Sequence, residues 1–222
     1  MKVESGKMYV ETLEIAGFEP AFKGMRNPKN SWGKSDSYCE FGEEGSDQLV
    51  YILGEKDLIL AQTLISAGTE HCKFLRMIQV WVDINFPRYV WSEFDTYHYN
   101  TKNSCSTMHK LFVKGNVISL ADFYYENLFE EESIEKTIAD LNVLQDMYFA
   151  QSNQLEKNKL LASAKRILNE GFLQLRTVNT NYAEIRSIYN QRKNHRLKSE
   201  WQDTFCKWCE QLPYFEELIL IK

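Results

Sequence analysis

The sequence predicts a single α+β domain in which β-strands are combined with long helices. In the segment FLRMIQVWVDIN the apolar residues Ile78, Val80, Val82 and Ile84 share one face, which is typical of a strand. Apolar residues instead recur at helical spacing over 134–147. The chain has 222 residues, of which 44% are hydrophobic, and this is enough to bury one sizeable core. We therefore expect one domain spanning 1–222.

The remaining elements follow in order along the chain. Loosely alternating apolar residues predict a strand over 8–18, and a strand-like stretch covers 171–178. Helical spacing predicts a helix over 56–67 and a second long helix over 153–168. A short aromatic helix or turn is expected over 88–97, and a final helix is expected to end before Pro213. The two long helices make 131–170 a helical segment. The segment 23–50 is rich in Gly, Asn, Ser and Asp without an apolar period, so it is predicted to be a long loop.

Composition excludes several classes of function. A net charge of −5 argues against general nucleic-acid binding, which requires a basic surface. No apolar run approaches the roughly 20 residues that span a bilayer, and the amino terminus lacks an apolar signal core, so we expect a cytoplasmic protein without a membrane partner. Five cysteines are an odd number, which favours free thiols. Cys206 and Cys209 form a lone CxxC, which cannot supply four zinc ligands, so no metal site is predicted, and the two cysteines are expected on or near the buried face of a helix.

The last third of the chain carries a concentrated cationic segment. Between Glu184 and Glu200 there is no acidic residue, whereas five Lys or Arg residues and His195 lie there. One interpretation is an exposed basic helix end. The other is a clamp for phosphate or carboxylate, because arginine offers forked donors to anions.

A polar stretch, YHYNTKNSCSTMH over 97–109, combines two histidines with Asn and Ser but only one lysine. Together with the segment that begins TLISAGTEHC and with TVNTNYAEIRSIYNQRKNHR, it resembles the flavin-dependent thymidylate synthases, the ThyX family. The stretch takes the place of the family signature Arg-His-Arg-x-x-Ser-x-Asn-Glu-x-Ser-x-Arg-Tyr. The similarity covers 70–110 and 171–213, in the family's order.

This resemblance implies a fold, a reaction and partners. The fold would be α+β, with a twisted, mainly antiparallel sheet packed with long helices. The family is homotetrameric, with sites between subunits, and methylates dUMP to dTMP with FAD, NADPH and methylenetetrahydrofolate. In such enzymes the cofactor carries the chemistry and the protein supplies binding and electrostatics, so no catalytic side chain is assigned here. A divergent copy of this size would suit a phage genome.

The resemblance also assigns residues to ligands. The residues expected to bind the nucleotide are Ser106, Asn103, Arg192, Tyr97 and Tyr99. The residues expected to bind the flavin are His71, His98, Asn179, Ser187, His195 and Arg196. The signature is degenerate, because Tyr97 and Tyr99 replace the two arginines that flank the central histidine, and Met108 replaces the last one. Each charge-assisted contact is worth about 1.5–3 kcal/mol, so these losses weaken phosphate binding.

Simpler interpretations remain open for the same residues. His71 and His98 would serve equally as interior histidines with satisfied hydrogen bonds, Asn103 and Ser106 as a turn or helix cap, and Arg192 as a helix-end charge. Three functions follow: an active flavin-dependent synthase, a catalytically silent protein that binds a nucleotide or a partner on the same scaffold, and a structural protein without a small-molecule site. The pocket is expected to gather 97–109 with 176–198.

Overall fold

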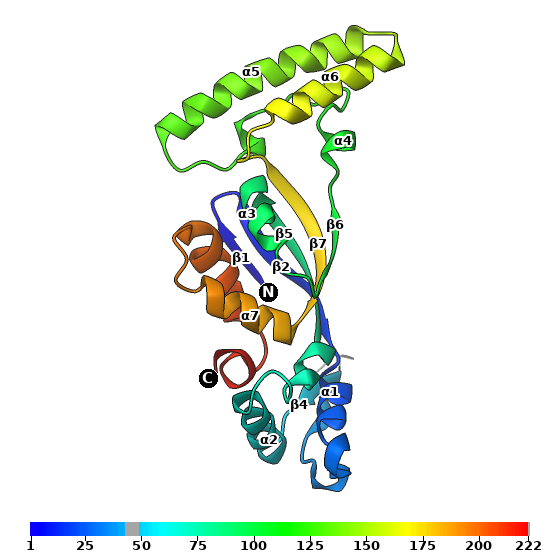
Figure 1. Cartoon of the computed structure of the whole chain (residues 1–222), viewed down its shortest axis with the longest axis vertical. Helices are drawn as coiled ribbons and strands as arrows, with labels where there is room; N and C mark the ends of the chain where they lie inside the picture. Colours follow the sequence, from blue (N-terminus) through cyan, green and yellow to red (C-terminus); the bar gives the residue numbers. More distant parts are fainter. Residues whose placement is uncertain (43–48, 222) are drawn as a thin grey trace.

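An antiparallel sheet of five strands forms the centre of the computed structural model, which describes residues 1–42 and 49–221 (Figure 1). The strand order is β1-β2-β5-β7-β6, with β1 (Lys2–Ser5), β2 (Met8–Ala16), β5 (Gln79–Pro87), β6 (Thr101–Ser104) and β7 (Leu173–Asn181). The central strand β5 pairs with β2 on one side and with β7 on the other. The predicted α+β class with a mainly antiparallel sheet is therefore confirmed.

The alternation of β5 decides which face of the sheet is covered. Val80, Val82 and Ile84 are buried, whereas Trp81 and Asp83 remain partly exposed. The predicted strand began at Phe74, but residues 73–77 form a 3₁₀ turn instead. Phe74 and Leu75 are both buried, and consecutive buried side chains fit a turn better than a strand that exposes every second residue.

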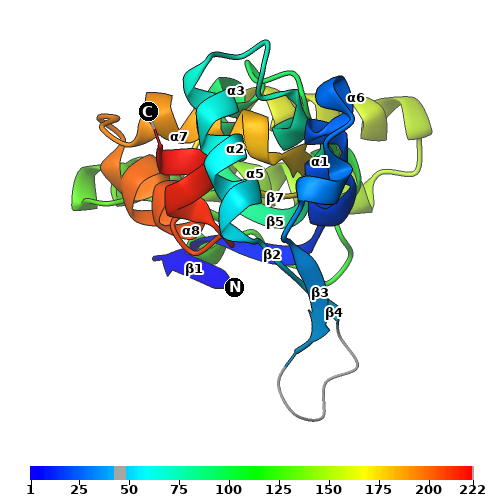
Figure 2. The same cartoon turned by 90° about the horizontal axis from the view of Figure 1, so that it is seen from below.

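Helices cover the buried face and both ends of the sheet (Figures 1 and 2). They are α1 (Phe18–Met25), α2 (Glu55–Ser66), α3 (Arg88–Phe94), α4 (Thr107–Lys110), α5 (Leu128–Ala150), α6 (Gln154–Ile167), α7 (Tyr182–Arg192), the π-helical segments η5 (Lys198–Cys206) and η6 (Glu216–Leu220), and α8 (Lys207–Cys209). The helices predicted over 56–67 and 153–168 are confirmed. None of the helices in the described residues combines the length and apolarity needed to cross a membrane.

Three helices begin with the same local sequence pattern, an Asn followed three residues later by a Glu. Asn127, Asn153 and Asn181 are the N-caps of α5, α6 and α7, and each side chain accepts a hydrogen bond from a backbone N–H of the first turn. An Asn at this position satisfies a donor that the helix itself leaves unpaired, and the Glu suits the positive end of the helix dipole.

The α5–α6 hairpin lies across one end of the sheet and has a hydrophobic cluster of its own (Figure 1). The buried side chains of this cluster from the hairpin and its exit are Ile134, Leu141, Leu161, Ala164 and Leu168. The cluster is separate from the main core, which fills the space between the sheet, α1, α2, α3, α7 and the C-terminal segments. The predicted helical segment 131–170 is thus a helical hairpin that extends the domain.

The segment 23–50, predicted as one long loop, contains regular structure. Short 3₁₀ turns occupy Asn27–Lys29 and Trp32–Lys34, and β3 (Tyr38–Phe41) pairs with β4 (Leu49–Ile52) in a hairpin that projects from the body of the molecule (Figure 2). Residues 43–48 of the predicted loop lie outside the described residues. Pairing between β3 and β4 satisfies backbone groups that a loop of this length would leave to water.

Two aspartates hold this segment against α2. Asp36 accepts hydrogen bonds from the backbone N–H groups of Lys56 (2.9 Å) and Asp57 (3.1 Å), and so acts as a cap from outside the helix. The fully buried Asp57 pairs through Oδ1 with Arg26 Nε at 2.5 Å and accepts a hydrogen bond from the Ser37 hydroxyl at 2.7 Å. Such a buried pair is destabilising when one partner is removed, because the other charge is left in the interior.

We expect Asp57→Asn to lower the free energy of unfolding by about 3 kcal/mol at neutral pH, measured by urea denaturation. Burial raises the pKa of Asp57. Hydrogen bonds from Ser35 and Ser37 and the pairing with Arg26 lower this pKa by more than burial raises it, so it lies below the ordinary value of 3.8. A carboxylate with a lowered folded pKa stabilises above its unfolded pKa and loses this effect as the pH falls through the folded pKa.

The difference in stability between wild type and Asp57→Asn should therefore be constant above about pH 5 and shrink in more acidic solution. Asp140→Asn, at an exposed position of α5, is the matched control and should change stability by less than about 0.5 kcal/mol. A difference that persists unchanged to the lowest pH would contradict the role of the Asp57 charge.

The two cysteines of the CxxC are buried, as the sequence favoured, and no group of metal-binding side chains occurs among the described residues. Burial raises the pKa of the Cys206 thiol to about 12. Iodoacetamide at pH 8 should therefore label the exposed Cys39 and Cys105 in the folded protein and leave Cys206 and Cys209 unmodified until urea is added. Peptide mass spectrometry would read the result, and prompt labelling of Cys206 in the native state would show that its surroundings are open.

Candidate functional site

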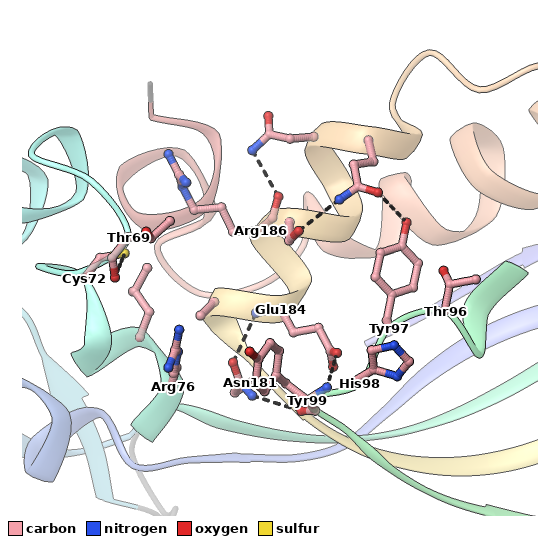
Figure 3. Close-up of a pocket in the computed structure, with 15 residues that line it drawn as sticks. Thr69, Cys72, Arg76, Thr96, Tyr97, His98, Tyr99, Asn181, Glu184 and Arg186 are labelled. Carbon is pink, nitrogen blue, oxygen red and sulfur yellow. Dashed lines mark hydrogen bonds between the residues drawn. The ribbon is translucent and has the colours of Figure 1, made fainter.

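A cleft of about 450 Å³ lies between the loop that follows α3 and the exposed side of α7 (Figure 3). The loop contributes Thr96, Tyr97, His98 and Tyr99, and α7 with its N-cap contributes Asn181, Ala183, Glu184, Arg186, Ser187, Asn190 and Gln191. The other wall comes from the turn before β5, with Thr69, Cys72, Leu75 and Arg76. The cleft therefore joins segments from three distant parts of the sequence, and its volume is within the range of small-molecule sites.

A buried carboxylate fixes the loop to the helix. The Glu184 carboxylate, 4% exposed, accepts hydrogen bonds from the Tyr99 backbone N–H (2.7 Å), from Asn100 Nδ2 (2.9 Å) and from Thr180 Oγ1 (2.7 Å). Asn181 Nδ2 donates to the Tyr99 carbonyl at 3.2 Å, which adds a second link to the same loop residue. The loop is consequently held on the first turn of α7, where the helix dipole favours a negative charge.

Tyr97 forms part of the protein interior at the edge of the cleft. Its ring packs edge-on against the Phe94 ring, with 6.0 Å between the two ring centres, and Tyr97 is only 9% exposed. The hydroxyl donates to Gln191 Oε1 (3.2 Å) and accepts from Arg192 Nε (2.8 Å). Burial raises the pKa of Tyr97 more than the neighbouring Arg192 lowers it, so the phenol stays protonated. Its hydrogen-bonding capacity is therefore already used inside the chain.

Arg192 is committed to an internal ion pair. Its Nη1 lies 2.6 Å from Glu93 Oε2, and its guanidinium carbon lies 4.4 Å from the centre of the Trp201 ring. The same Glu93 oxygen accepts from Trp201 Nε1 at 3.0 Å and lies 3.5 Å from His195 Nε2. Glu93 thus neutralises the arginine that the sequence assigned to a nucleotide phosphate, and it gathers His195 into the same cluster.

Tyr99 and His98 present the accessible surface of the loop. Tyr99 is 67% exposed, and the guanidinium carbon of Arg76 lies 5.3 Å from its ring centre. His98 is exposed beside it and lines the cleft. An exposed aromatic ring beside polar groups offers a stacking surface for a flat ligand.

The other predicted site residues are distributed over the molecule. Ser187 lines the cleft with Tyr97, His98 and Tyr99. Asn103 lies on β6 opposite Thr177, and Ser106 precedes α4. Asn179 on β7 donates to Gln79 Oε1 at 3.3 Å. Arg196 is exposed, and neither it nor Arg192, Asn103, Ser106, Asn179 or His195 is among the residues that line the cleft.

His71 borders a different and larger cavity, of about 1250 Å³, between α1, α2 and the turn before β5. This second cavity is rich in cations, with Lys29, Lys34, Lys56 and Lys73 among its lining residues and Glu70 as an acidic one. Met25, Leu64, Phe74 and Met77 add apolar surface. The structure thus separates His71 from the remaining predicted residues.

The sequence patterns give no binding role to Arg76, Asn181 and Glu184, whereas Arg186 belongs to the cationic segment for which a clamp for phosphate or carboxylate is one interpretation. The Asn-x-x-Glu pattern at 181–184 is a local signal that would have found the first turn of α7. No local signal would have found Arg76, because its contact with Tyr99 joins segments that only the fold brings together.

Glu184→Gln should loosen the loop while preserving the shape of the side chain. We expect the free energy of unfolding to fall by about 2–4 kcal/mol, because charge-assisted hydrogen bonds are weakened. Hydrogen exchange of the Tyr99 amide, followed by NMR, should become faster than in wild type. Glu132→Gln, at an exposed position of α5, should leave both quantities unchanged. An unaltered Tyr99 exchange rate in Glu184→Gln would show that the loop is held by other contacts.

The fold and this cleft can now be compared with known proteins. No family model matches the sequence, and no curated protein matches it. Among solved structures, two of thymidylate synthase X (ThyX) from Helicobacter pylori with FAD and dUMP are similar. Each superposes with a TM-score of 0.68 at 17% sequence identity, over 96% of this chain and 97% of the other. The chain therefore has a ThyX-like fold, in agreement with the expectation from the sequence.

Proposed function

We propose that the protein binds a pyrimidine nucleotide of the dUMP type in the cleft between residues 96–99 and α7. The observation that carries this proposal is the cleft itself, of about 450 Å³, in which the exposed ring of Tyr99 adjoins the amide and hydroxyl groups of α7. A nucleotide offers a flat base for the ring and polar groups for the helix. Support also comes from the similar fold of the ThyX structures solved with dUMP.

Binding without turnover is the function that this geometry supports best. The signature arginines of the ThyX family are replaced by Tyr97 and Tyr99, and the Tyr97 hydroxyl is engaged with Gln191 and Arg192. Arg192 is paired with Glu93 at 2.6 Å and does not line the cleft, so its charge is partly neutralised and lies outside the proposed binding site. A silent nucleotide-binding protein on the ThyX-like scaffold follows from these features.

Flavin-dependent methylation of dUMP to dTMP is the second candidate, because the similar structures contain FAD as well as dUMP. His98 and Ser187, both predicted to contact the flavin, do line the cleft. The cleft of one chain, however, lies in the lower part of the volume range of small-molecule sites, and the family resemblance implies sites that form between subunits. A complete flavin site would need surface from a second subunit of the predicted homotetramer, and NADPH and methylenetetrahydrofolate would be required for turnover.

The first experiment is a visible absorption spectrum of the purified protein, followed by calorimetric titration with dUMP, dAMP and FAD. We expect a colourless protein that binds dUMP with a micromolar Kd, and dAMP serves as the comparison with a purine nucleotide of the same charge. Tyr99→Ala should weaken dUMP binding about tenfold, through loss of about 1–3 kcal/mol of stacking. Phe129→Ala, an exposed aromatic on α5, is the matched control.

Each outcome separates the candidate functions. A flavin spectrum, or FAD binding that promotes formation of dTMP in the presence of NADPH and methylenetetrahydrofolate, would establish the synthase in place of the silent protein. If FAD binds but dUMP does not, the nucleotide proposal is contradicted. Absence of binding to any of these ligands at millimolar concentration would leave the third function from the sequence, a structural protein, as the best account.

A further inference from the structure

The cleft contains two guanidinium groups that have no acidic partner among the described residues. Four arginines form ion pairs with carboxylates, namely Arg26, Arg88, Arg176 and Arg192. Of the others in the described part of the chain, Arg166 and Arg196 are exposed outside the cleft, whereas Arg76 and Arg186 line it. The charge available to a ligand is therefore concentrated at Arg76 and Arg186.

Arg76 is held in place without using its hydrogen-bond donors. The guanidinium lies over the ring of Tyr99, 5.3 Å from its centre, and within the described residues its side chain makes no hydrogen bond or ion pair. Stacking of this kind restricts the planar group and leaves the N–H groups at its edge free. An arginine presented in this way is suited to bind two oxygens of a phosphate or carboxylate.

Arg186 extends from α7 into the same cleft and is incompletely bonded. Its Nη2 donates to the Ile221 carbonyl at 2.8 Å, but the buried Nε has no hydrogen-bond partner. A buried donor without an acceptor is unfavourable, and such atoms in native structures call for an explanation. An anion that draws the guanidinium toward the cleft would provide the missing acceptor.

The positions of the charges indicate how a ligand would lie. Figure 3 shows Arg76 and Arg186 on the side of the cleft where Thr69 and Cys72 are found, with Tyr97 and His98 on the opposite side. The Glu184 carboxylate lies between the two sides, and its bonds to Tyr99, Asn100 and Thr180 keep it near the loop. A phosphate is repelled by Glu184 and attracted by the arginines, so it should occupy the Thr69 side.

We propose that Arg76 and Arg186 together form the phosphate-binding element of this cleft, replacing the anion binding that Arg192 and the degenerate signature no longer supply. This inference rests on the proposed nucleotide function of the same cleft and specifies its ligand as a phosphorylated nucleoside. The base would lie beside the Tyr99 ring on the side of Tyr97 and His98, and the 5′-phosphate toward Thr69 and Cys72. The lysine-rich second cavity near His71 is the competing location.

The test compares dUMP with deoxyuridine, which lacks the phosphate, by calorimetry on the full-length protein. Wild type should bind dUMP at least about tenfold more tightly than deoxyuridine. Arg76→Gln and Arg186→Gln should each weaken dUMP binding by about tenfold to a hundredfold, as expected for one charge-assisted contact. Their affinity for deoxyuridine should stay within about twofold of wild type.

Several variants serve as controls. Arg166→Gln carries the same substitution at an exposed position of α6 and should bind like wild type. Lys34→Gln and Lys56→Gln probe the second cavity and should also bind like wild type. Because Arg186→Gln removes the bond to Ile221, its Tm is measured as well. Arg76→Gln removes a stacking contact with Tyr99 but no hydrogen bond to any described residue, so its Tm should stay close to that of wild type, and measuring it confirms that the variant is folded.

The outcomes distinguish this inference from the proposed function. If dUMP binds but neither arginine variant alters its preference over deoxyuridine, the arginine element is wrong and the nucleotide function stands. If Lys34→Gln or Lys56→Gln abolishes binding instead, the nucleotide occupies the second cavity, and both the arginine element and the proposed cleft are wrong. If dUMP does not bind, inorganic pyrophosphate is titrated as the probe. Pyrophosphate binding that Arg76→Gln abolishes would support the arginine element alone, and no binding of either probe would overturn both proposals.

Discussion

The buried carboxylate of Glu184 is the constraint on which the cleft depends. It accepts hydrogen bonds from the backbone of Tyr99, from Asn100 and from Thr180, and so joins the loop after α3 to the end of β7 and the start of α7. A charge with 4% exposure is tolerable only because these donors and the helix dipole surround it. Together with the hydrogen bond from Asn181 Nδ2 to the Tyr99 carbonyl, this anchor fixes the exposed residues His98 and Tyr99 relative to α7.

The distribution of arginine partners explains how a ThyX-like fold differs locally from the family signature. Two carboxylates of the α3 region neutralise cations around the loop that follows this helix. Glu93 pairs with Arg192, and Asp95 pairs with both Arg176 and Lys102. Positive charge is thereby withdrawn from the strand and helix ends that carry the expected site. Among the described residues that line the cleft, the arginines without an acidic partner are Arg76, in the turn before β5, and Arg186, on α7.

The α5–α6 hairpin is stabilised separately from the candidate site. α5 and α6 bury Leu141 and Leu161 in a cluster of their own, and several of the remaining apolar side chains of α5, such as Phe129 and Val143, stay exposed. The hairpin does not contribute to the lining of the cleft between α7 and residues 96–99. Within the chain, therefore, the hairpin and the candidate site are structurally independent, and changes on the hairpin serve as controls for changes in the site.

Elements whose signals are local could be predicted from the amino-acid sequence. The alternation around Val82 specified the central strand, helical spacing specified α2, α5 and α6, and the burial of the CxxC followed from its helical setting. Ordered similarity over separated segments indicated the fold. The tertiary structure alone decided which arginines are neutralised, because Glu93 and Arg192 are far apart in the chain and ion pairing depends on distances of a few ångströms. The tertiary structure also decided that much of the predicted 23–50 loop forms turns and a hairpin. Asp36 and Asp57 hold this segment through contacts between distant residues, which no local sequence pattern encodes.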